Sequence, residues 1–323
     1  MAIKNSGSSL SFTEIESEFG ANGSRSLGAY RLTQNVGSLT NLPLDSGIPT
    51  SGTIKFSDFY GKRLNVVVDC FSGGDETRTI AKNDKWNNNQ LTVIGGFRSQ
   101  KEGGSKIIIN VNKKICSDKN GVTNCALKTG SWDATAVVQV DVGSSGQILG
   151  SGGDGGRGRN GIDGSAEAGF AGSSGLGIEV NNTTVNVASG GIIRAGFGGG
   201  GGGGGSRQVD KGEDRRASGG GGGGGAGCPP GNGGPGGTTG AGGEAGDAGN
   251  ETTGGSGGVG GNAGNGQAIG GTGGTGGQAQ GGPGGGEGGA GANGAAIRRT
   301  SGFTVNINNS GTISGDTSAA GVS

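Results

Sequence analysis

The hydrophobic and polar positions of this chain divide it into three parts with different patterns. In the first part, 1–62, apolar residues between Leu10 and Phe19 recur at spacings of two to four. Ser11 and Glu14 have the spacing of a capping box, so a short helix is predicted to begin here. With so few apolar side chains, this part is marginal as an independent domain. We therefore expect it to dock on something larger.

The second part, 63–150, has the pattern of β-structure. Runs rich in Val and Ile are separated by Gly, Asn and Asp, and apolar and polar residues alternate within the last run. The sequence predicts an antiparallel β-domain. Its expected strands are Leu64–Cys70, Gln90–Phe97, Lys106–Asn112 and Thr135–Val142.

An internal repeat links the second part to the third, 151–323. The segments 140–150, 185–195 and 305–315 align without gaps, and each is a short alternating run, a polar turn and an Ile-containing run. Glycine-rich sequence follows the first two segments directly. We expect these strands to form a platform from which glycine tracts project and to which they return.

Composition determines what those tracts can be. Glycine accounts for 87 of the 323 residues, and 199–296 contains no aromatic residue and three large aliphatic ones. No hydrophobic core can hold that stretch together. The pure tracts Gly198–Gly205 and Gly219–Gly225, and a two-glycine period elsewhere, match the three-residue repeat of the polyproline II conformation. The predicted fold is mainly β with a polyglycine II helix bundle (a sandwich) and little α-helix; a flexible linker is the alternative.

Several functional classes are excluded by the residue inventory. The chain contains no histidine, which removes catalytic triads and His-ligated metal sites. Its 25 basic residues balance 25 acidic ones, which argues against a general nucleic-acid or anionic-membrane binder. No apolar run is long enough for membrane insertion, and no signal peptide is recognised, so we expect synthesis in the cytoplasm. We expect no enzyme activity, no cofactor and no metal site.

The four cysteines leave two alternatives open. Cys116 and Cys125 flank a turn-like segment and could form a disulfide across a hairpin, or the thiols could all be free.

The breaks between glycine tracts are the candidate recognition sites, because loops on a rigid scaffold often carry function. One break is strongly charged and another contains two prolines. The candidate receptor-binding residues are Arg207, Asp210, Lys211, Glu213, Asp214, Arg215, Arg216, Cys228, Pro229, Pro230, Asn232, Asn250 and Glu251.

Two parts of the chain resemble known families. Residues 11–20 followed by 48–61 resemble an N-terminal module of virion proteins in tailed bacteriophages, and the glycine tracts resemble the polyglycine II sandwich of phage tail-fibre tip adhesins. The resemblance implies a virion protein that attaches to other tail or fibre proteins through its N-terminal part and binds a host surface receptor, protein or glycan, through its tip loops. The residues expected to serve attachment are Phe12, Ile15, Phe19, Phe56, Phe59 and Tyr60.

Three functions follow as alternatives. A tail-fibre tip adhesin is the first, a virion structural component without receptor contact the second, and a glycine-rich ice-binding or matrix protein the third. The charged segment 206–218 speaks against a regular ice-binding face. A homotrimer is one oligomeric state compatible with a fibre.

Overall fold

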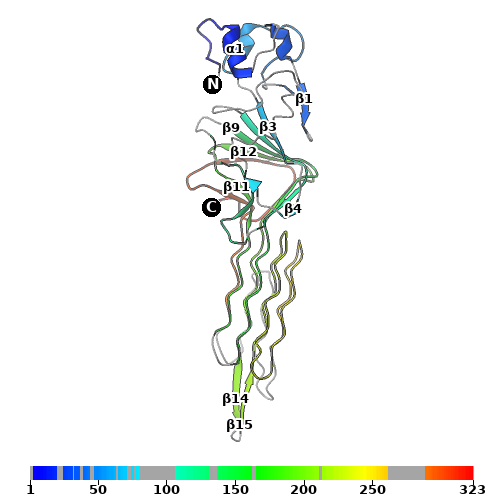
Figure 1. The fold of residues 1–323 in the computed structure, drawn as a ribbon, viewed down its shortest axis with the longest axis vertical. Helices are drawn as coiled ribbons and strands as arrows, with labels where there is room; N and C mark the ends of the chain where they lie inside the picture. The colour runs from blue at the N-terminus through cyan, green and yellow to red at the C-terminus, as the bar shows by residue number, and fades with distance from the viewer. Residues whose placement is uncertain are drawn as a thin grey trace.

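The computed structural model is elongated, with an N-terminal unit at one end, three β-sheets in the middle and glycine tracts extending to the other end (Figure 1). None of the helices in the described part of the chain is long and apolar enough to span a membrane. The structure describes residues 3–19, 25–31, 33–36, 39–43, 47–62, 65–70, 74–75, 78–79, 106–118, 120–130, 132, 137–161, 165–210, 213–260 and 288–322.

The N-terminal unit begins with the predicted helix, α1 (Phe12–Phe19). Its capping box is formed: the Ser11 N–H donates to Glu14 Oε2 over 2.8 Å, and the Glu14 N–H donates to Ser11 Oγ over 3.4 Å. Hydrogen bonds from the Lys4 side chain and from Ser11 hold the pKa of Glu14 down at about 2. The carboxylate that closes the cap is therefore charged at neutral pH.

Two 3₁₀ helices and a hairpin complete this unit. They are η1 (Leu27–Tyr30), η2 (Phe56–Phe59), β1 (Thr33–Val36) and β2 (Leu39–Pro43), with β1 and β2 antiparallel. Aromatic rings pack edge-to-face at its centre, where Tyr30 and Phe59 have ring centroids 5.6 Å apart. The unit thus has a small hydrophobic core of its own, made of Ile3, Ile15, Phe19, Tyr30, Ile48 and Phe59.

The central region consists of three parallel five-stranded sheets, which we call the first, second and third faces. The first face contains β3 (Asn65–Cys70), β6 (Lys106–Val111), β9 (Val137–Val142), β12 (Thr183–Val187) and β17 (Val305–Asn309). The second contains β4 (Gly74–Asp75), β7 (Lys114–Cys116), β10 (Gln147–Leu149), β13 (Ile192–Arg194) and β18 (Thr312–Ser314). The third contains β5 (Arg78–Thr79), β8 (Cys125–Lys128), β11 (Ser174–Ile178), β16 (Ile297–Arg299) and β19 (Ala319–Ala320).

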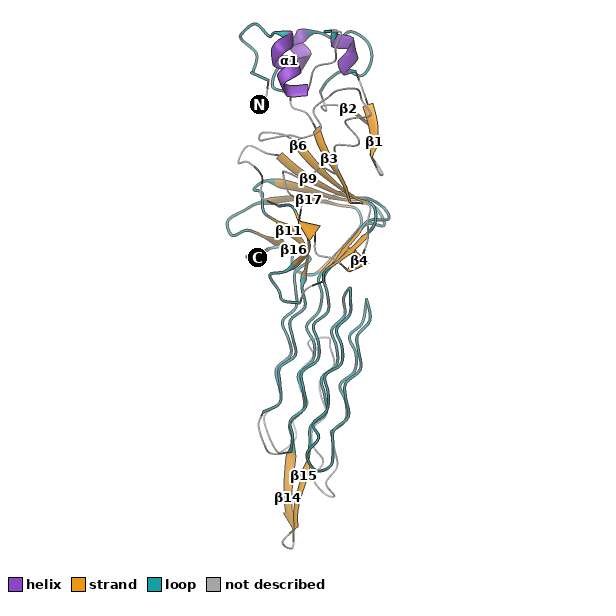
Figure 2. Ribbon diagram, in the orientation of Figure 1, coloured by secondary structure: helices purple, strands orange, loops and turns teal. Residues whose placement is uncertain are grey.

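The chain visits the three faces in turn, so each set of three strands is one coil of a three-sided solenoid (Figure 2). Successive coils stack in register, and matching inward side chains form columns. On the first face Ile109, Val140 and Val185 lie at paired positions and are fully buried. The second and third faces supply equivalent buried columns, Ile115–Ile148–Ile193 and Leu127–Leu176–Ile297. Apolar side chains meeting at the axis hold this region together.

The predicted antiparallel pairing of 63–150 is wrong: the strands found there pair in parallel, within sheets that also contain strands from beyond residue 150. Alternation shows that a strand has one buried face, but it does not show the direction of its neighbour. Three of the four predicted strands correspond to β3, β6 and β9, and the fourth, Gln90–Phe97, lies outside the described residues. The predicted boundary at residue 150 divides these sheets.

The internal repeat is confirmed as three coils. Its segments correspond to β9–β10, β12–β13 and β17–β18, which stack on one another in register. The glycine-rich chain leaves the solenoid at the corner between the second and third faces, after β10 and after β13, and returns at β11 and β16. The predicted platform is therefore present.

Beyond that corner, extended glycine-rich tracts lie side by side (Figure 2). We label them A (150–160), B (166–173), C (195–205), D (218–227), E (231–239), F (241–250), G (254–260) and H (288–296). Hydrogen bonds join neighbours at every third residue: the N–H groups of Gly153, Gly156 and Arg159 donate to carbonyls of tract C over 2.8–2.9 Å. The same spacing of three recurs between the other tracts.

Tracts C and D, which contain the two pure glycine runs, lie inside the bundle. Tract D exchanges hydrogen bonds with tracts A, C, E, F and G, and tract C with A, B, D and H. Every residue of Gly198–Gly205 and Gly219–Gly225 is buried. A Cβ on Gly222 would lie 2.0 Å from the Gly200 carbonyl oxygen, so only glycine allows this approach.

Candidate functional site: the two ends of the glycine bundle

The loops between tracts alternate between two ends of the bundle, because each tract runs its full length before the chain turns back. We call the end at the solenoid the near end and the opposite end the far end. Turns at 228–230 and 250–253 lie at the near end. Residue 161, the hairpin of β14 (Ser206–Asp210) and β15 (Glu213–Ala217), and the turn 238–241 lie at the far end.

The β14–β15 hairpin extends past the tracts and forms the tip of the molecule, opposite the N-terminal unit (Figure 1). Its antiparallel register pairs Arg207 with Arg216 and Asp210 with Glu213. Like charges at directly opposite positions destabilise a strand pair. The predicted candidates Arg207, Asp210, Glu213, Asp214, Arg215 and Arg216 all belong to this hairpin, and Lys211 lies outside the described residues.

Side chains that the sequence analysis did not select tie the far-end loops together. The Ser218 hydroxyl accepts a hydrogen bond from the Gly161 N–H over 3.0 Å and donates to the Thr239 carbonyl over 2.7 Å. Asn160 Oδ1 accepts from the Thr238 N–H over 2.8 Å. These contacts hold three far-end segments in fixed positions relative to one another. The far-end segments could have been found by counting the loops between glycine tracts along the sequence, since every second loop must lie at the same end of the bundle.

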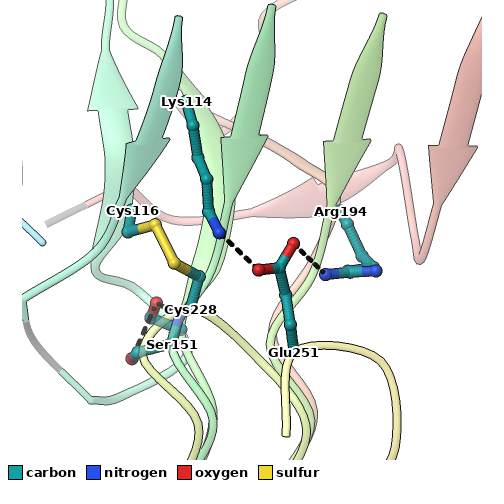
Figure 3. Close-up of a disulfide and its surroundings, with 7 residues drawn as sticks. Lys114, Cys116, Ser151, Arg194, Cys228 and Glu251 are labelled. Atoms are coloured by element: carbon teal, nitrogen blue, oxygen red, sulfur yellow. Dashed lines mark hydrogen bonds and ion pairs between the residues drawn. A yellow bond between two sulfur atoms is a disulfide. The ribbon is translucent and has the colours of Figure 1, made fainter. Parts of the chain in front are cut away.

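The remaining predicted candidates lie at the near end, away from the tip. Cys228 is buried and forms a disulfide with Cys116 at the end of β7 (Figure 3). Cys116 and Cys125 lie on different faces of the solenoid, around a corner, so the hairpin disulfide between them is wrong. Cys70 and Cys125 are free and buried.

Burial also makes the free thiol of Cys125 unreactive. It raises the pKa of Cys125 to about 12, and the Sγ lies 3.7 Å from the Thr123 carbonyl oxygen that accepts its hydrogen bond. A thiol with so high a pKa stays protonated and is a poor nucleophile.

Glu251 occupies the other near-end turn and faces the second face of the solenoid. Its carboxylate lies between the side chains of Lys114 on β7 and Arg194 on β13, and forms an ion pair with each (Figure 3). The distance to Arg194 Nη2 is 3.4 Å. Together with the disulfide, this contact clamps the near end of the bundle to the solenoid.

The other near-end candidates also make local contacts. Asn250 Oδ1 accepts hydrogen bonds from the N–H groups of Thr252 and Thr253, which closes the turn. Pro229 accepts a hydrogen bond from the Gly152 N–H, and Pro230 is exposed. Asn232 is exposed at the start of tract E, where its N–H donates to Asp154 Oδ1 over 2.7 Å.

The six predicted attachment residues divide by burial. Ile15, Phe19 and Phe59 are fully buried in the core of the N-terminal unit, so they hold its fold. The half-buried residues are Phe12, Phe56 and Tyr60. The rings of Phe12 and Phe56 pack edge-to-face with centroids 4.9 Å apart.

Within the described ranges, no group of three His, Cys, Asp or Glu side chains is placed to hold a metal ion.

A comparison with protein-family models identifies the family of this chain. Residues 75–318, most of the chain, match the model of the phage tail fibre adhesin Gp38 family. The chain belongs to this family. It is thus a phage tail-fibre adhesin. The match extends from β4 to the residue before β19, which includes the glycine bundle, while the N-terminal unit and β3 lie outside it.

Other comparisons add less. No curated protein matches the chain. Among solved structures, the adhesin is similar to the crystal structure of the gp37–gp38 adhesin tip complex of the bacteriophage S16 long tail fibre, with 21% sequence identity, a TM-score of 0.38, and 83% of this chain and 88% of that chain covered. The assignment rests on the family match, which also favours an adhesin over an ice-binding or matrix protein.

Proposed function

We propose that this adhesin binds a host-cell surface receptor through the far end of its glycine bundle, chiefly the β14–β15 hairpin. The observation that carries the proposal is the position of the hairpin, which projects beyond the tracts at the end opposite the N-terminal unit (Figure 1). We propose further that the protein acts by binding and not as an enzyme.

The bundle supplies the rigid scaffold that such a site needs. We propose that its tracts are polyglycine II helices, on the basis of their three-residue hydrogen-bond period and buried glycines. Each net backbone hydrogen bond contributes about 0.5–1.5 kcal/mol, and many occur in parallel. Loops held by such a lattice can vary in sequence without loss of the fold.

The charges of the hairpin indicate the kind of receptor. Its arginines, including the paired Arg207 and Arg216, could form forked hydrogen bonds with phosphate or carboxylate groups of a surface glycan. The mixture of signs suits specific pairing better than general attraction to an anionic surface.

Binding of the purified protein to whole cells of a susceptible strain tests the receptor site. Replacing Arg215 and Arg216 by alanine should abolish binding, and thermal unfolding of the variant checks that the fold is kept. The matched control removes two arginines from the N-terminal unit, Arg25 and Arg31, and should bind normally. Normal binding by the Arg215/Arg216 variant would contradict the proposal, and no binding by the unaltered protein would favour a virion component without receptor contact.

We also propose that the N-terminal unit attaches the adhesin to other tail-fibre proteins. It has its own core, it lies at the end opposite the hairpin, and Phe12 and Phe56 are half exposed on it. Deleting residues 1–61 should leave cell binding intact but remove the protein from virions. Co-purification of the truncated adhesin with particles would contradict this role.

A further inference from the structure

Half of the described glycine tracts have no solenoid strand to continue into. Tracts A and C follow directly from β10 and β13, and tracts B and H lead directly into β11 and β16. The near ends of tracts D, E, F and G meet instead in two turns, 228–230 between D and E and 250–253 between F and G. Other contacts must therefore hold these two turns against the solenoid.

Each of the two turns has its own side-chain tether to the second face (Figure 3). The D–E turn is joined by the Cys116–Cys228 disulfide, and the F–G turn by the ion pairs of Glu251. The turns also contact each other, because the Gly227 N–H donates to the Asn250 carbonyl oxygen over 3.1 Å. One tether is thus covalent and sensitive to redox conditions, while the other is ionic and reversible.

The surroundings of the disulfide make it persistent and selective. Cys116 is 1% exposed and Cys228 is 7% exposed, and both pack with Leu149. A reductant therefore reaches the bond only when the turn opens. The other two cysteines, Cys70 on the first face and Cys125 on the third, are free and buried. Oxidation of this protein accordingly affects a single pair.

We propose that Cys116 and Cys228 form a redox latch. They are thiols in the cytoplasm, where we expect the adhesin to be made, and they bond after it leaves. The oxidant is a low-molecular-weight disulfide such as oxidised glutathione. One cysteine thiolate attacks it and releases a first reduced thiol, and the other attacks the mixed disulfide and releases a second. Two electrons and two protons pass from the cysteines to the released thiols.

The latch acts on the tip because the β14–β15 hairpin joins the two halves of the bundle. Strand β14 follows tract C, which continues from β13, whereas β15 leads into tract D, whose near end is latched. One strand of the hairpin is thus anchored to the solenoid through the backbone and the other through the disulfide. With the thiols reduced, the near end of tract D opens more often and the hairpin is less fixed. The consequence for receptor binding rests on the function proposed for the hairpin.

Counting thiols in acid-quenched cells that express the adhesin tests the order of events. After denaturation and alkylation, protein from the cytoplasm should have four alkylated cysteines, and protein treated with oxidised glutathione should have two. The control Cys116→Ser/Cys228→Ser should have two in both samples. A bond already complete at quenching, or four thiols after the treatment, would overturn the latch.

Amide hydrogen exchange of the full-length protein measures latching without a receptor. Oxidation should slow exchange of Gly227 by about tenfold or more. It should leave Gly196 unchanged, since Gly196 begins tract C and its N–H donates to the Ser173 carbonyl oxygen over 2.8 Å. Equal exchange of Gly227 in the oxidised and reduced forms would overturn the latch.

Binding to whole cells then tests the link to the hairpin. The oxidised form should bind more tightly than the reduced form, and equal binding would overturn that link. If neither form binds, the function proposed for the hairpin is wrong, while the thiol count and the exchange rates still decide the latch.

Glu251 supplies a further test, because its ion pairs hold the F–G turn beside the D–E turn. Glu251→Ala should slow formation of the disulfide by oxidised glutathione and speed its reduction, each by about two- to fivefold. The matched control is Glu244→Ala, an exposed position in the middle of tract F, which should react at the rate of the unaltered protein. Equal rates for the two variants would overturn the role given to Glu251.

Discussion

The solenoid and the glycine bundle are both built by stacking repeated units in register, yet they bury opposite parts of the chain. In the solenoid, side-chain columns such as Ile115–Ile148–Ile193 fill the interior and the backbone lies at the faces. In the bundle, tract D is enclosed by five other tracts, and its interior contains only backbone. A protein core thus does not require hydrophobic side chains, provided that backbones approach closely enough to satisfy one another's hydrogen bonds.

The difference determines which substitutions each region tolerates. A solenoid column loses stability when a side chain becomes smaller, because a cavity remains. The bundle loses stability when a side chain is added, because the space is occupied by a carbonyl group. The following changes use that contrast, beginning with the largest expected effect.

Gly222→Val should unfold the bundle. The new Cβ would lie 2.0 Å from the Gly200 carbonyl oxygen, and that backbone is itself enclosed by neighbours. We expect a loss of more than about 4 kcal/mol, measured by thermal unfolding and protease resistance of the bundle. Gly242→Val is the matched control, since its Cβ would meet only one atom, at 3.6 Å. Equal melting curves for the two variants would mean that the tracts are not packed.

Ile148→Ala should destabilise the solenoid by about 2–5 kcal/mol, because Ile148 is fully buried in the column of the second face. Chemical denaturation measures the loss. Gln139→Ala, at a half-buried outward position of β9, removes hydrogen bonds to the Asp141 carboxylate but leaves no cavity, so it should cost about 0.5–1.5 kcal/mol. Comparable losses from both substitutions would contradict the assignment of the inward column.

Breaking the Cys116–Cys228 disulfide should loosen the near end of the bundle. The two cysteines are 112 residues apart in sequence, so their bond closes a long loop and is worth about 2–4 kcal/mol. Replacing both by serine should lower the melting temperature of the bundle, and a reducing agent should then have no further effect. If the reductant lowers the melting temperature of the serine variant as much as that of the unaltered protein, this bond is not the clamp.

Glu251→Ala should have the smallest effect, about 0–1 kcal/mol, because ion pairs this exposed are weak. Its side chain is 40% exposed, that of Lys114 is 43% exposed, and only that of Arg194, at 15%, is largely buried. Raising the salt concentration should have little additional effect on the variant. A loss as large as that of the disulfide variant would show that the ion pairs hold the bundle more strongly than their exposure suggests.

The sequence predicts the solenoid strands better than their arrangement. The alternation in Val138, Val140 and Val142 identifies β9, and the gapless repeat identifies the coils that stack on it. The strands of the third face are short, and β11 contains two glycines, so their pattern is too weak to recognise. Without that face, the neighbouring strands have the pattern of an ordinary sheet.

For the candidate site, sequence composition located the loops but not the end at which each lies. The charged segment between the two pure glycine runs is at the tip (Figure 1), and its role in receptor binding stays a prediction. Cys228 and Glu251 lie instead at the near end, where their partners are Cys116, Lys114 and Arg194. Those partners are distant in sequence, so no local pattern could have indicated the contacts.

Amide hydrogen exchange of the inner glycines tests most directly whether a backbone lattice holds the tip. In protein labelled with ¹⁵N-glycine and ¹⁵N-valine, Gly200 and Gly222 should be protected to the same degree as Val140 in β9, because their N–H groups donate to Gly223 and Gly156 over 2.8 Å inside the bundle. Exchange of the two glycines at the rate of an unstructured chain, with Val140 still protected, would contradict the account and make the tracts a linker.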